Sequence, residues 1–324
     1  MCYNKTMKIP ITQSEAWKKL QDDLGETSFY EKKGNYEYLA ILKSTPVGNY
    51  LYLPYGPVYK DKSGFEETYK ALKELAKSHN AIFIRVESLD PDFKSYAPKG
   101  TVKSKDLNPA DTWVLDLTPE KADIISGFSQ GTRTRFNTFA KKGLSVTSTT
   151  DTNEIKHLVT LQNKLYKTKN LNVFSEKYLK TELAQPFSTL YLVKYNRPET
   201  VDQDANLPKE NQILAASLFF DYEDTRYYMQ SAADIDYKKL PATVALLTTA
   251  IFDAKEKGIK YFDFWGIAPD VAPKDHPWAG FTEFKKSFGG EAKHYAGTYD
   301  IVLKPAKYKL YHATRRFGRI IHKS

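Results

Sequence analysis

The sequence predicts an α/β protein made of two similar domains in tandem, with a ligand-binding cleft between them. Its 324 residues suit two domains of ordinary size. Both halves contain strand patterns, then an amphipathic helix, then a hydrophobic strand that ends at a loop. Ligands commonly bind between such domains. We expect residues 1–148 together with 300–324 to form the first domain, and residues 149–299 to form the second.

The first half begins with a capped helix, in which Ser14 is the N-cap and Trp17 and Leu20 share one face. Apolar runs then predict strands, and the pattern of residues 64–79 predicts a helix. The expected strands are 36–43, 50–53, 81–87, 112–117 and 144–148. A further helix is expected to open at Thr118 and Pro119, because proline suits the first helical turn.

The second half opens with two helical patterns, 153–168 and 175–183. A long apolar helix is expected over 240–257, and Gly258 is a typical stop. The expected strands are 189–195, 213–220, 226–230 and 261–267, with a polar hairpin loop over 196–211. A last strand within 294–304 and a C-terminal helix are expected to cross back onto the first domain.

Composition excludes several classes of protein. With 41% hydrophobic and 27% charged residues, the chain is typical of soluble globular proteins, and no run suits a signal peptide or a membrane span. The single cysteine, Cys2, excludes an internal disulfide and a cysteine-based metal cluster, which fits the cytoplasm. The six histidines lack metal-ligand spacing. We therefore expect a cytoplasmic protein with no metal and no cofactor. We also expect a monomer, although composition does not determine the oligomeric state.

The net charge of +9 favours a polyanionic partner such as nucleic acid, a phosphorylated metabolite or an anionic membrane. Basic residues gather in TRTRFNTFAKKG and in the C-terminal KPAKYKLYHATRRFGRIIHK. The candidates for contact with phosphate in the first cluster are Arg133, Arg135, Lys141 and Lys142. Either cluster is also consistent with a solvated helix face.

The segment 261–291 carries the main candidate for catalysis. It reads YFDFWGIAPD, then a Pro-rich loop, then GFTEFKKSFGGE, so that Lys285 follows Phe284 on a short helix ending in Gly-Gly. A cation held beside an apolar wall at the carboxyl end of a strand can stabilise negative charge on a reacting carbonyl group. The alternative is a surface lysine on an amphipathic helix. No P-loop, GxGxxG or HExxH motif occurs.

The helix–strand order of the second half resembles the N-acetyltransferase (GNAT) superfamily. In that fold a Gly-rich turn before the long helix normally cradles the pyrophosphate of coenzyme A. Here the segment reads DIDYKKLPATVALL, which has no glycine, and Pro241 removes a backbone donor. We therefore expect the acyl group to arrive on a carrier other than coenzyme A.

Several segments resemble, in order along nearly the whole chain, the Fem family of aminoacyl-tRNA-dependent peptidyltransferases of peptidoglycan synthesis. They are TQSEAWKKL, YLPYGPV, DTWVLDL, KKGLSV, YYMQSAAD, YFDFWGI, EFKKSFGGE and YAGTYDIVLKP. The resemblance implies two acetyltransferase-like domains in tandem. No long helical arm is visible in the sequence, which is similar to the compact form of the family.

The resemblance implies roles for particular residues. Lys285, after Phe284, would stabilise the oxyanion formed when the acceptor amine attacks the aminoacyl ester. Lys19 matches a lysine that holds the acceptor diphosphate, and the alternative is a solvated surface lysine. The other substrate-binding candidates are Tyr178 and Tyr228, which fall where tyrosines line the acceptor cleft, and Glu87, which falls where Asp is usual. For each tyrosine, core packing is the alternative.

Two positions depart from the family pattern. Phe174 and Tyr55 stand where the compact members have basic residues near the acceptor. The acceptor head group would then be held differently, for example by Lys167 or Lys169, or would be another molecule.

The expected function is transfer of an amino acid from aminoacyl-tRNA to the stem peptide of a peptidoglycan precursor, either UDP-MurNAc-pentapeptide or lipid II. Peripheral contact of the basic C-terminal helix with the inner face of the membrane would suit a lipid-linked acceptor. Two alternatives stay open: an N-acyltransferase that uses coenzyme A or acyl-carrier protein, and a non-catalytic module that binds tRNA or precursor.

Overall fold

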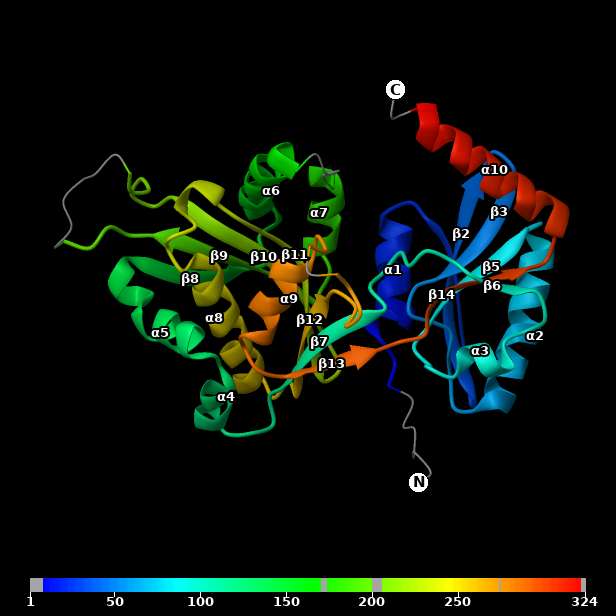
Figure 1. Cartoon of the computed structure of the whole chain (residues 1–324), viewed down its shortest axis with the longest axis horizontal. Coiled ribbons are helices and arrows are strands. Elements are labelled where there is room, and N and C mark those ends of the chain that lie inside the picture. Colours follow the sequence, from blue (N-terminus) through cyan, green and yellow to red (C-terminus); the bar gives the residue numbers. More distant parts are fainter. Residues whose placement is uncertain (1–7, 170–173, 200–205, 274, 322–324) are drawn as a thin grey trace. The chain divides into compact units, whose positions relative to one another are not determined.

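A computed structural model describes residues 8–169, 174–199, 206–273 and 275–321. Cys2 and part of the expected loop 196–211 lie outside the described residues. The chain forms two compact units, one of Met1–Ala110 with His294–Ser324 and one of Asp111–Lys293. Each contains a seven-stranded mixed sheet with helices (Figure 1). The α/β class and the presence of two units are confirmed, and a cleft between them stays a prediction.

The boundary between the units lies earlier than the expected one at residues 148/149. The reason is strand pairing: β7 (Asp111–Asp116) pairs with β12 (Tyr261–Gly266), and β8 (Leu144–Thr149) pairs with β9 (Ser188–Tyr195). Residues 111–148 therefore complete the sheet of the second unit. The chain returns to the first unit as expected, because β14 (Gly297–Val302) joins its sheet.

The sheet of the first unit has the strand order β1-β2-β3-β5-β14-β6, and β4 pairs with β2. The parallel neighbours β3 and β5 are joined through α2, and the other pairs are antiparallel. The strands are β1 (Thr27–Lys33), β2 (Tyr36–Thr45), β3 (Gly48–Leu53), β4 (Val58–Tyr59), β5 (Phe83–Ser88), β6 (Thr101–Lys103) and β14. The helices are α1 (Glu15–Asp23), α2 (Lys62–Ser78), α3 (Phe93–Tyr96) and α10 (Pro305–Ile321).

A buried ion pair lies inside this unit. Arg85 on β5 donates to both carboxylate oxygens of Asp300 on β14, at 2.7 and 2.8 Å, and both side chains are 2% exposed or less. Tyr308 on α10 donates to the same carboxylate at 2.8 Å. Because fork-shaped guanidinium–carboxylate pairs have strict geometry, this network fixes α10 against its sheet.

The sheet of the second unit has the order β13-β7-β12-β11-β10-β9-β8. Its remaining strands are β10 (Ile213–Tyr222), β11 (Thr225–Ala233) and β13 (Glu291–His294). Its helices are α4 (Lys121–Gly127), α5 (Gln130–Thr138), α6 (Ile155–Lys169), α7 (Glu176–Leu183), α8 (Ala242–Glu256) and α9 (Ala279–Lys286). Residues of α4 and α8 share one core cluster with the sheet, and α6 packs on β10 and β11 outside that cluster.

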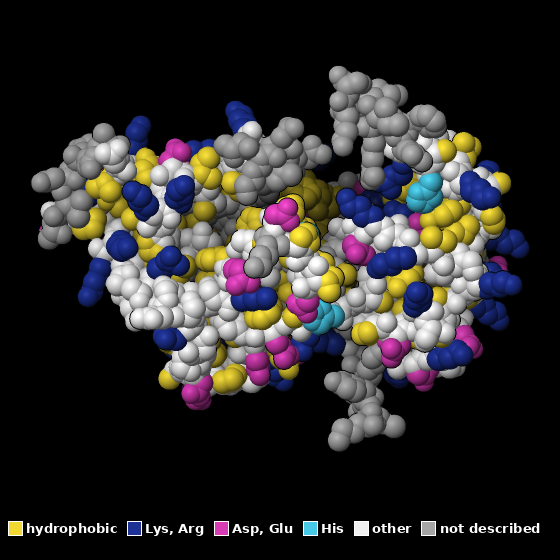
Figure 2. Space-filling view, viewed as in Figure 1, with side chains coloured by type: hydrophobic (Ala, Val, Ile, Leu, Met, Phe, Trp, Pro, Cys, Tyr) yellow, Lys and Arg dark blue, Asp and Glu magenta, His cyan; other side chains and the backbone are white. Residues whose placement is uncertain are grey.

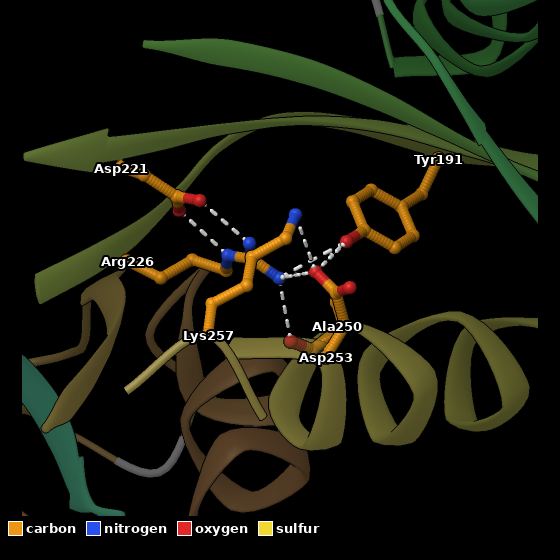
Figure 3. A network of polar contacts seen from close by, with 6 residues as sticks. All are labelled: Tyr191, Asp221, Arg226, Ala250, Asp253 and Lys257. Carbon is orange, nitrogen blue, oxygen red and sulfur yellow. Dashed lines mark hydrogen bonds and ion pairs between the residues drawn. The ribbon is translucent and has the colours of Figure 1, made fainter. Parts of the chain in front are cut away.

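The long helix α8 is held by a buried arginine as well as by its apolar residues. Arg226 on β11 is 0% exposed and donates twice to Asp221, at 2.6 Å each. Its Nη1 donates to the carbonyl of Ala250 at 2.8 Å and to Asp253 at 2.7 Å, both on α8 (Figure 3). Tyr191 on β9 also bonds Asp253. The network therefore ties three strands to one helix.

Most expected elements are present, and the exceptions are local. Ser14 caps α1, accepting from the backbone N–H of Trp17. The strand β1 was not predicted, because TSFYEKK is mostly polar and half exposed. The helix expected from Thr118 begins instead at Lys121, after Glu120. The last expected strand is interrupted and forms β13 and β14.

Candidate active site

The candidate site lies in the second unit, where β11 and β12 part. Their parallel register joins only Thr225–Tyr227 with Tyr261–Asp263, although β11 continues to Ala233 and β12 to Gly266. On its other side, β12 shifts register against β7 between Asp263 and Gly266. The carboxyl end of β12 therefore leaves the regular ladder, which is where ligands bind in open α/β sheets.

The backbone at this point is unusual. Trp265 has a φ of +66°, a conformation that large side chains rarely adopt. Its backbone N–H donates to Asp263 Oδ1 at 2.7 Å, which stabilises the turn. Backbone conformations of this kind gather at functional sites.

Lys285 reaches this strand end from α9. The side chain is 9% exposed, and its Nζ donates to the carbonyl oxygen of Gly266 at 2.5 Å. Burial lowers the pKa of Lys285 to about 8, and the negative charge of Asp263 offsets part of that effect. An ammonium group has three donors, so the contact with Gly266 uses one of them. The nitrogen is thus sheltered from bulk solvent and remains mostly charged at pH 7.

Contacts between residues of the segment 268–288 fix the helix that carries Lys285. The hydroxyl of Thr282 accepts from the N–H of Ala268 at 2.8 Å and donates to the carbonyl of Trp278 at 2.9 Å. Phe284 packs against the core of the second unit and contacts the ring of Phe288 at 5.3 Å. The two hydrogen bonds of Thr282 join the ends of the loop between β12 and α9.

The Gly-Gly stop after α9 has a steric reason. Both glycines have positive φ, +74° and +95°. A Cβ on Gly290 would lie 2.4 Å from the carbonyl oxygen of Val114, so only glycine fits. The carbonyl of Gly289 accepts from Trp113 Nε1 at 2.7 Å. Close approach to β7 thus sets where α9 ends and where Lys285 points.

The two tyrosines expected in the site make packing contacts. Tyr228 donates to Ser231 at 2.7 Å and its ring stacks on Phe219, with centroids 5.5 Å apart. Tyr178 is half-buried on α7 and stacks on Phe174 at 4.9 Å. A role for either tyrosine in binding stays a prediction.

A buried acid lies beside Tyr178 and was not predicted from the sequence. Glu182 on α7 is 1% exposed, and burial raises its pKa to about 8, although a hydrogen bond with Tyr178 acts in the opposite direction. It is therefore mostly protonated at pH 7. The spacing of four residues from Tyr178 would have placed the two side chains on one helix face, but nothing in the sequence marks this Glu as buried.

Lys19 and Glu87 belong to the first unit. Lys19 is a surface lysine whose Nζ pairs with Asp23 at 2.6 Å, and its side chain is 66% exposed. The carboxylate of Glu87 is buried and accepts from the backbone and side-chain N–H groups of Asn108, at 2.9 and 2.8 Å, and from the N–H of Tyr55 at 3.3 Å. In the described contacts Glu87 holds two loops together.

The residues that replace the expected basic ones differ in exposure. Tyr55 is buried and donates to the carbonyl of Pro109 at 2.8 Å, whereas Phe174 is 43% exposed. Lys167 is exposed on α6. The side chain of Lys169 lies outside the part of the chain that the structure describes.

Of the four basic candidates that follow α4, one donates hydrogen bonds to nearby carbonyl groups and three are exposed. Arg133 bonds the carbonyls of Ser126, at 3.0 Å, and of Phe128, so it closes the turn between α4 and α5. Arg135, Lys141 and Lys142 are exposed. Figure 2 shows Lys and Arg side chains over the visible surface of both units. Contact of this cluster with phosphate stays a prediction.

Two absences among the described residues concern metal sites and membrane spans. Among these residues, no group of three or more His, Cys, Asp or Glu side chains is placed to hold a metal ion. No helix there has the length and apolar character needed to span a bilayer. Pro241 stands directly before α8, in the segment without glycine.

The chain has a two-unit α/β fold in which a buried lysine, Lys285, lies at the end of a strand. The chain belongs to the FemAB family, whose sequence profile matches residues 4–97 and 156–316. Membership supports aminoacyl transfer in cell-wall synthesis as the class of activity, without specifying the substrates. A comparison with curated protein sequences found no match.

Solved structures resemble the fold over nearly the whole chain. FemX is 17% identical, with a TM-score of 0.78 over 93% of this chain and 94% of that chain. The C-terminal domain of a protein described as a lysylphosphatidylglycerol synthetase from Agrobacterium fabrum is 14% identical, with a TM-score of 0.60 over 93% and 92%. L-PGS from Bacillus licheniformis is 15% identical, with a TM-score of 0.57 over 96% and 99%. These likenesses concern the fold alone, an α/β architecture that this chain shares with them.

Proposed function

We propose that the protein moves an amino acid from aminoacyl-tRNA to the stem peptide of a peptidoglycan precursor, UDP-MurNAc-pentapeptide or lipid II. The observation that carries the proposal is the buried ammonium group of Lys285 at the end of β12. Membership of the FemAB family supports it. We assign aminoacyl-tRNA binding and catalysis to the second unit. We assign acceptor binding to the first unit, with Tyr178 and Tyr228 of the second unit as further contacts. We further propose that it acts as a cytoplasmic monomer without a cofactor.

In this reaction the acceptor amine attacks the carbonyl carbon of the aminoacyl ester. A C–N bond forms, the ester C–O bond breaks, and the proton lost by the amine ends on the ribose oxygen of the tRNA. The chemical demand is orientation and stabilisation of the tetrahedral oxyanion. Lys285 supplies the positive charge for that oxyanion, and Phe284 supplies the apolar wall beside it.

The remaining candidates fit the two substrates. Arg135, Lys141 and Lys142 are exposed cations that suit tRNA phosphates, and Arg133 shapes their turn. Lys19, Glu87, Tyr178 and Tyr228 are proposed for the acceptor. The salt bridge from Lys19 to Asp23 is exposed and weak, so a diphosphate can displace it.

The test is incubation of the purified chain with a mixture of charged tRNAs and either acceptor. Mass spectrometry of the acceptor should show an added amino acid and its point of attachment. If neither acceptor gains mass while acetyl-coenzyme A binds saturably, the protein is an N-acyltransferase that uses coenzyme A. If tRNA binds tightly and no acceptor gains mass, it is a binding module.

The pH dependence of transfer should show a loss of activity as the pH rises through about 8, the pKa of Lys285. The sign follows from the role: only the protonated amine stabilises an oxyanion, and the fraction protonated falls above this pKa. The measurement is the ratio of kcat in wild type to kcat in Lys285→Arg across pH. The ratio cancels titration of the acceptor amine, and arginine stays charged throughout. A ratio that rises through pH 8 would show that the neutral lysine acts, as a base.

A further inference from the structure

The C-terminal helix α10 has two different faces. Tyr308 and Tyr311 are buried, and pack against Phe83 and Tyr50 of the first unit. The opposite side of the helix carries Leu310, which is 54% exposed. One face of α10 is therefore used by the fold, and the other is presented to solvent.

The outward face has a helical apolar pattern. Ala306, Leu310 and Ala313 follow one another at spacings of four and three residues, and all three are exposed. The two alanines leave the leucine side chain prominent between them. In the sequence, Phe317 and Ile320 continue the same spacing. An apolar stripe that faces water costs free energy unless something covers it.

Cations flank this stripe. Lys307 and Lys309 are exposed on either side of Leu310. Arg315 is also exposed, but it lies on the side of Tyr311, to whose Oη its guanidinium donates at 2.6 Å. After Asp300, the sequence contains no Asp or Glu. It contains seven basic residues: Lys304, Lys307, Lys309, Arg315, Arg316, Arg319 and Lys323.

We infer that the outward face of α10, centred on Leu310 and flanked by Lys307 and Lys309, is a docking surface for an anionic lipid bilayer. Helices that lie in a membrane interface combine an apolar stripe with flanking lysine and arginine. The apolar stripe enters the boundary of the acyl chains, and the lysines pair with anionic head groups. A tRNA surface would be satisfied by the cations alone and gives no reason for exposed apolar residues at helical spacing.

The anchoring of α10 supports this surface. Tyr308 is tied to Asp300, whose carboxylate is held by Arg85 inside the sheet. The helix is therefore fixed before it meets a bilayer, so docking does not have to order it. Such preorganisation lowers the free-energy cost of binding.

The test is cosedimentation of the full chain with vesicles. Wild type should bind vesicles made of equal parts phosphatidylglycerol and phosphatidylcholine, and should not bind pure phosphatidylcholine. Lys307→Glu with Lys309→Glu should weaken binding to the anionic vesicles by at least about tenfold. Leu310→Ser, which keeps the charge, should weaken it by about tenfold through lost apolar burial.

The matched control is Lys70→Glu with Lys77→Glu, which changes the net charge equally at exposed positions on α2 of the same unit. It should retain wild-type binding to the vesicles. Equal loss in this control would reduce the effect to net charge and overturn the inference, as would failure of wild type to bind anionic vesicles. If the Lys307 and Lys309 variant keeps vesicle binding and loses tRNA binding, α10 is a tRNA surface. Vesicle binding is measured without transfer, so the result is independent of the proposed reaction.

Discussion

Replacement of Lys285 by methionine should lower kcat for aminoacyl transfer by about 10²–10³-fold, the usual cost of removing one oxyanion donor. Methionine has a similar length and keeps the contact with the apolar surroundings. The side chain is buried and its pKa is lowered to about 8, so burying its charge costs stability at pH 7. That cost lessens as the pH rises from about 8 toward the ordinary value of 10.5. The variant should therefore be no less stable than wild type at pH 7.

The matched control is Lys286→Met on the same helix. The side chain of Lys286 is 40% exposed and lies 3.7 Å from Glu283, so its loss should change kcat little. The measurements are single-turnover transfer rates and the Kd for each substrate, with unfolding midpoints for both variants. Wild-type rates in Lys285→Met, or an equal loss in both variants, would remove Lys285 from the mechanism.

Replacement of Arg226 by methionine should lower the free energy of unfolding by about 3 kcal/mol, the lower part of the range for breaking a buried ion pair. The lower part applies because the partners Asp221 and Asp253 are 28% and 32% exposed, so water partly solvates them once they are unpaired. Burial alone would raise the pKa of Asp253, but bonds from Tyr191 and Arg226 hold it below its ordinary value. The measurement is denaturation in urea.

Lys257 provides the control for this network. Its Nζ lies 3.0 Å from Asp253, and its side chain is 50% exposed (Figure 3). Lys257→Met should therefore cost less than about 1 kcal/mol. Similar losses in the two variants would show that the network is not held by its buried arginine.

The sequence predicted elements well where the pattern was local. Ser14 and the apolar run of α8 act within a few residues, so the sequence alone indicated the structure. The Gly-Gly stop was also visible in the sequence, although its steric cause is the distant Val114 on β7. The domain boundary was not local. Thr112 in β7 pairs with Gly266 in β12, and an apolar run predicts a strand without showing which partner it takes.

Part of the candidate site was predictable in the same way. A lysine at a strand end was expected from 261–291. Its burial excludes the alternative of a surface lysine, and its catalytic role stays a prediction. The structural partners of Glu87 were not predictable, because Asn108 and Tyr55 reach its carboxylate from two separate loops. The sequence places Arg226 in a strand but does not show its burial. Its buried charge is paired with Asp221 on β10 and Asp253 on α8.

The position of β14 has a consequence for synthesis of the chain. This strand lies between β5 and β6 in the first sheet, yet the ribosome makes it after all of Asp111–Lys293. The N-terminal segment therefore leaves the ribosome with one edge of β5 lacking its native partner. That edge gains the partner only after residues 297–302 are synthesised. The second unit is continuous in sequence, so all of its strands are synthesised before the strand that completes the first sheet.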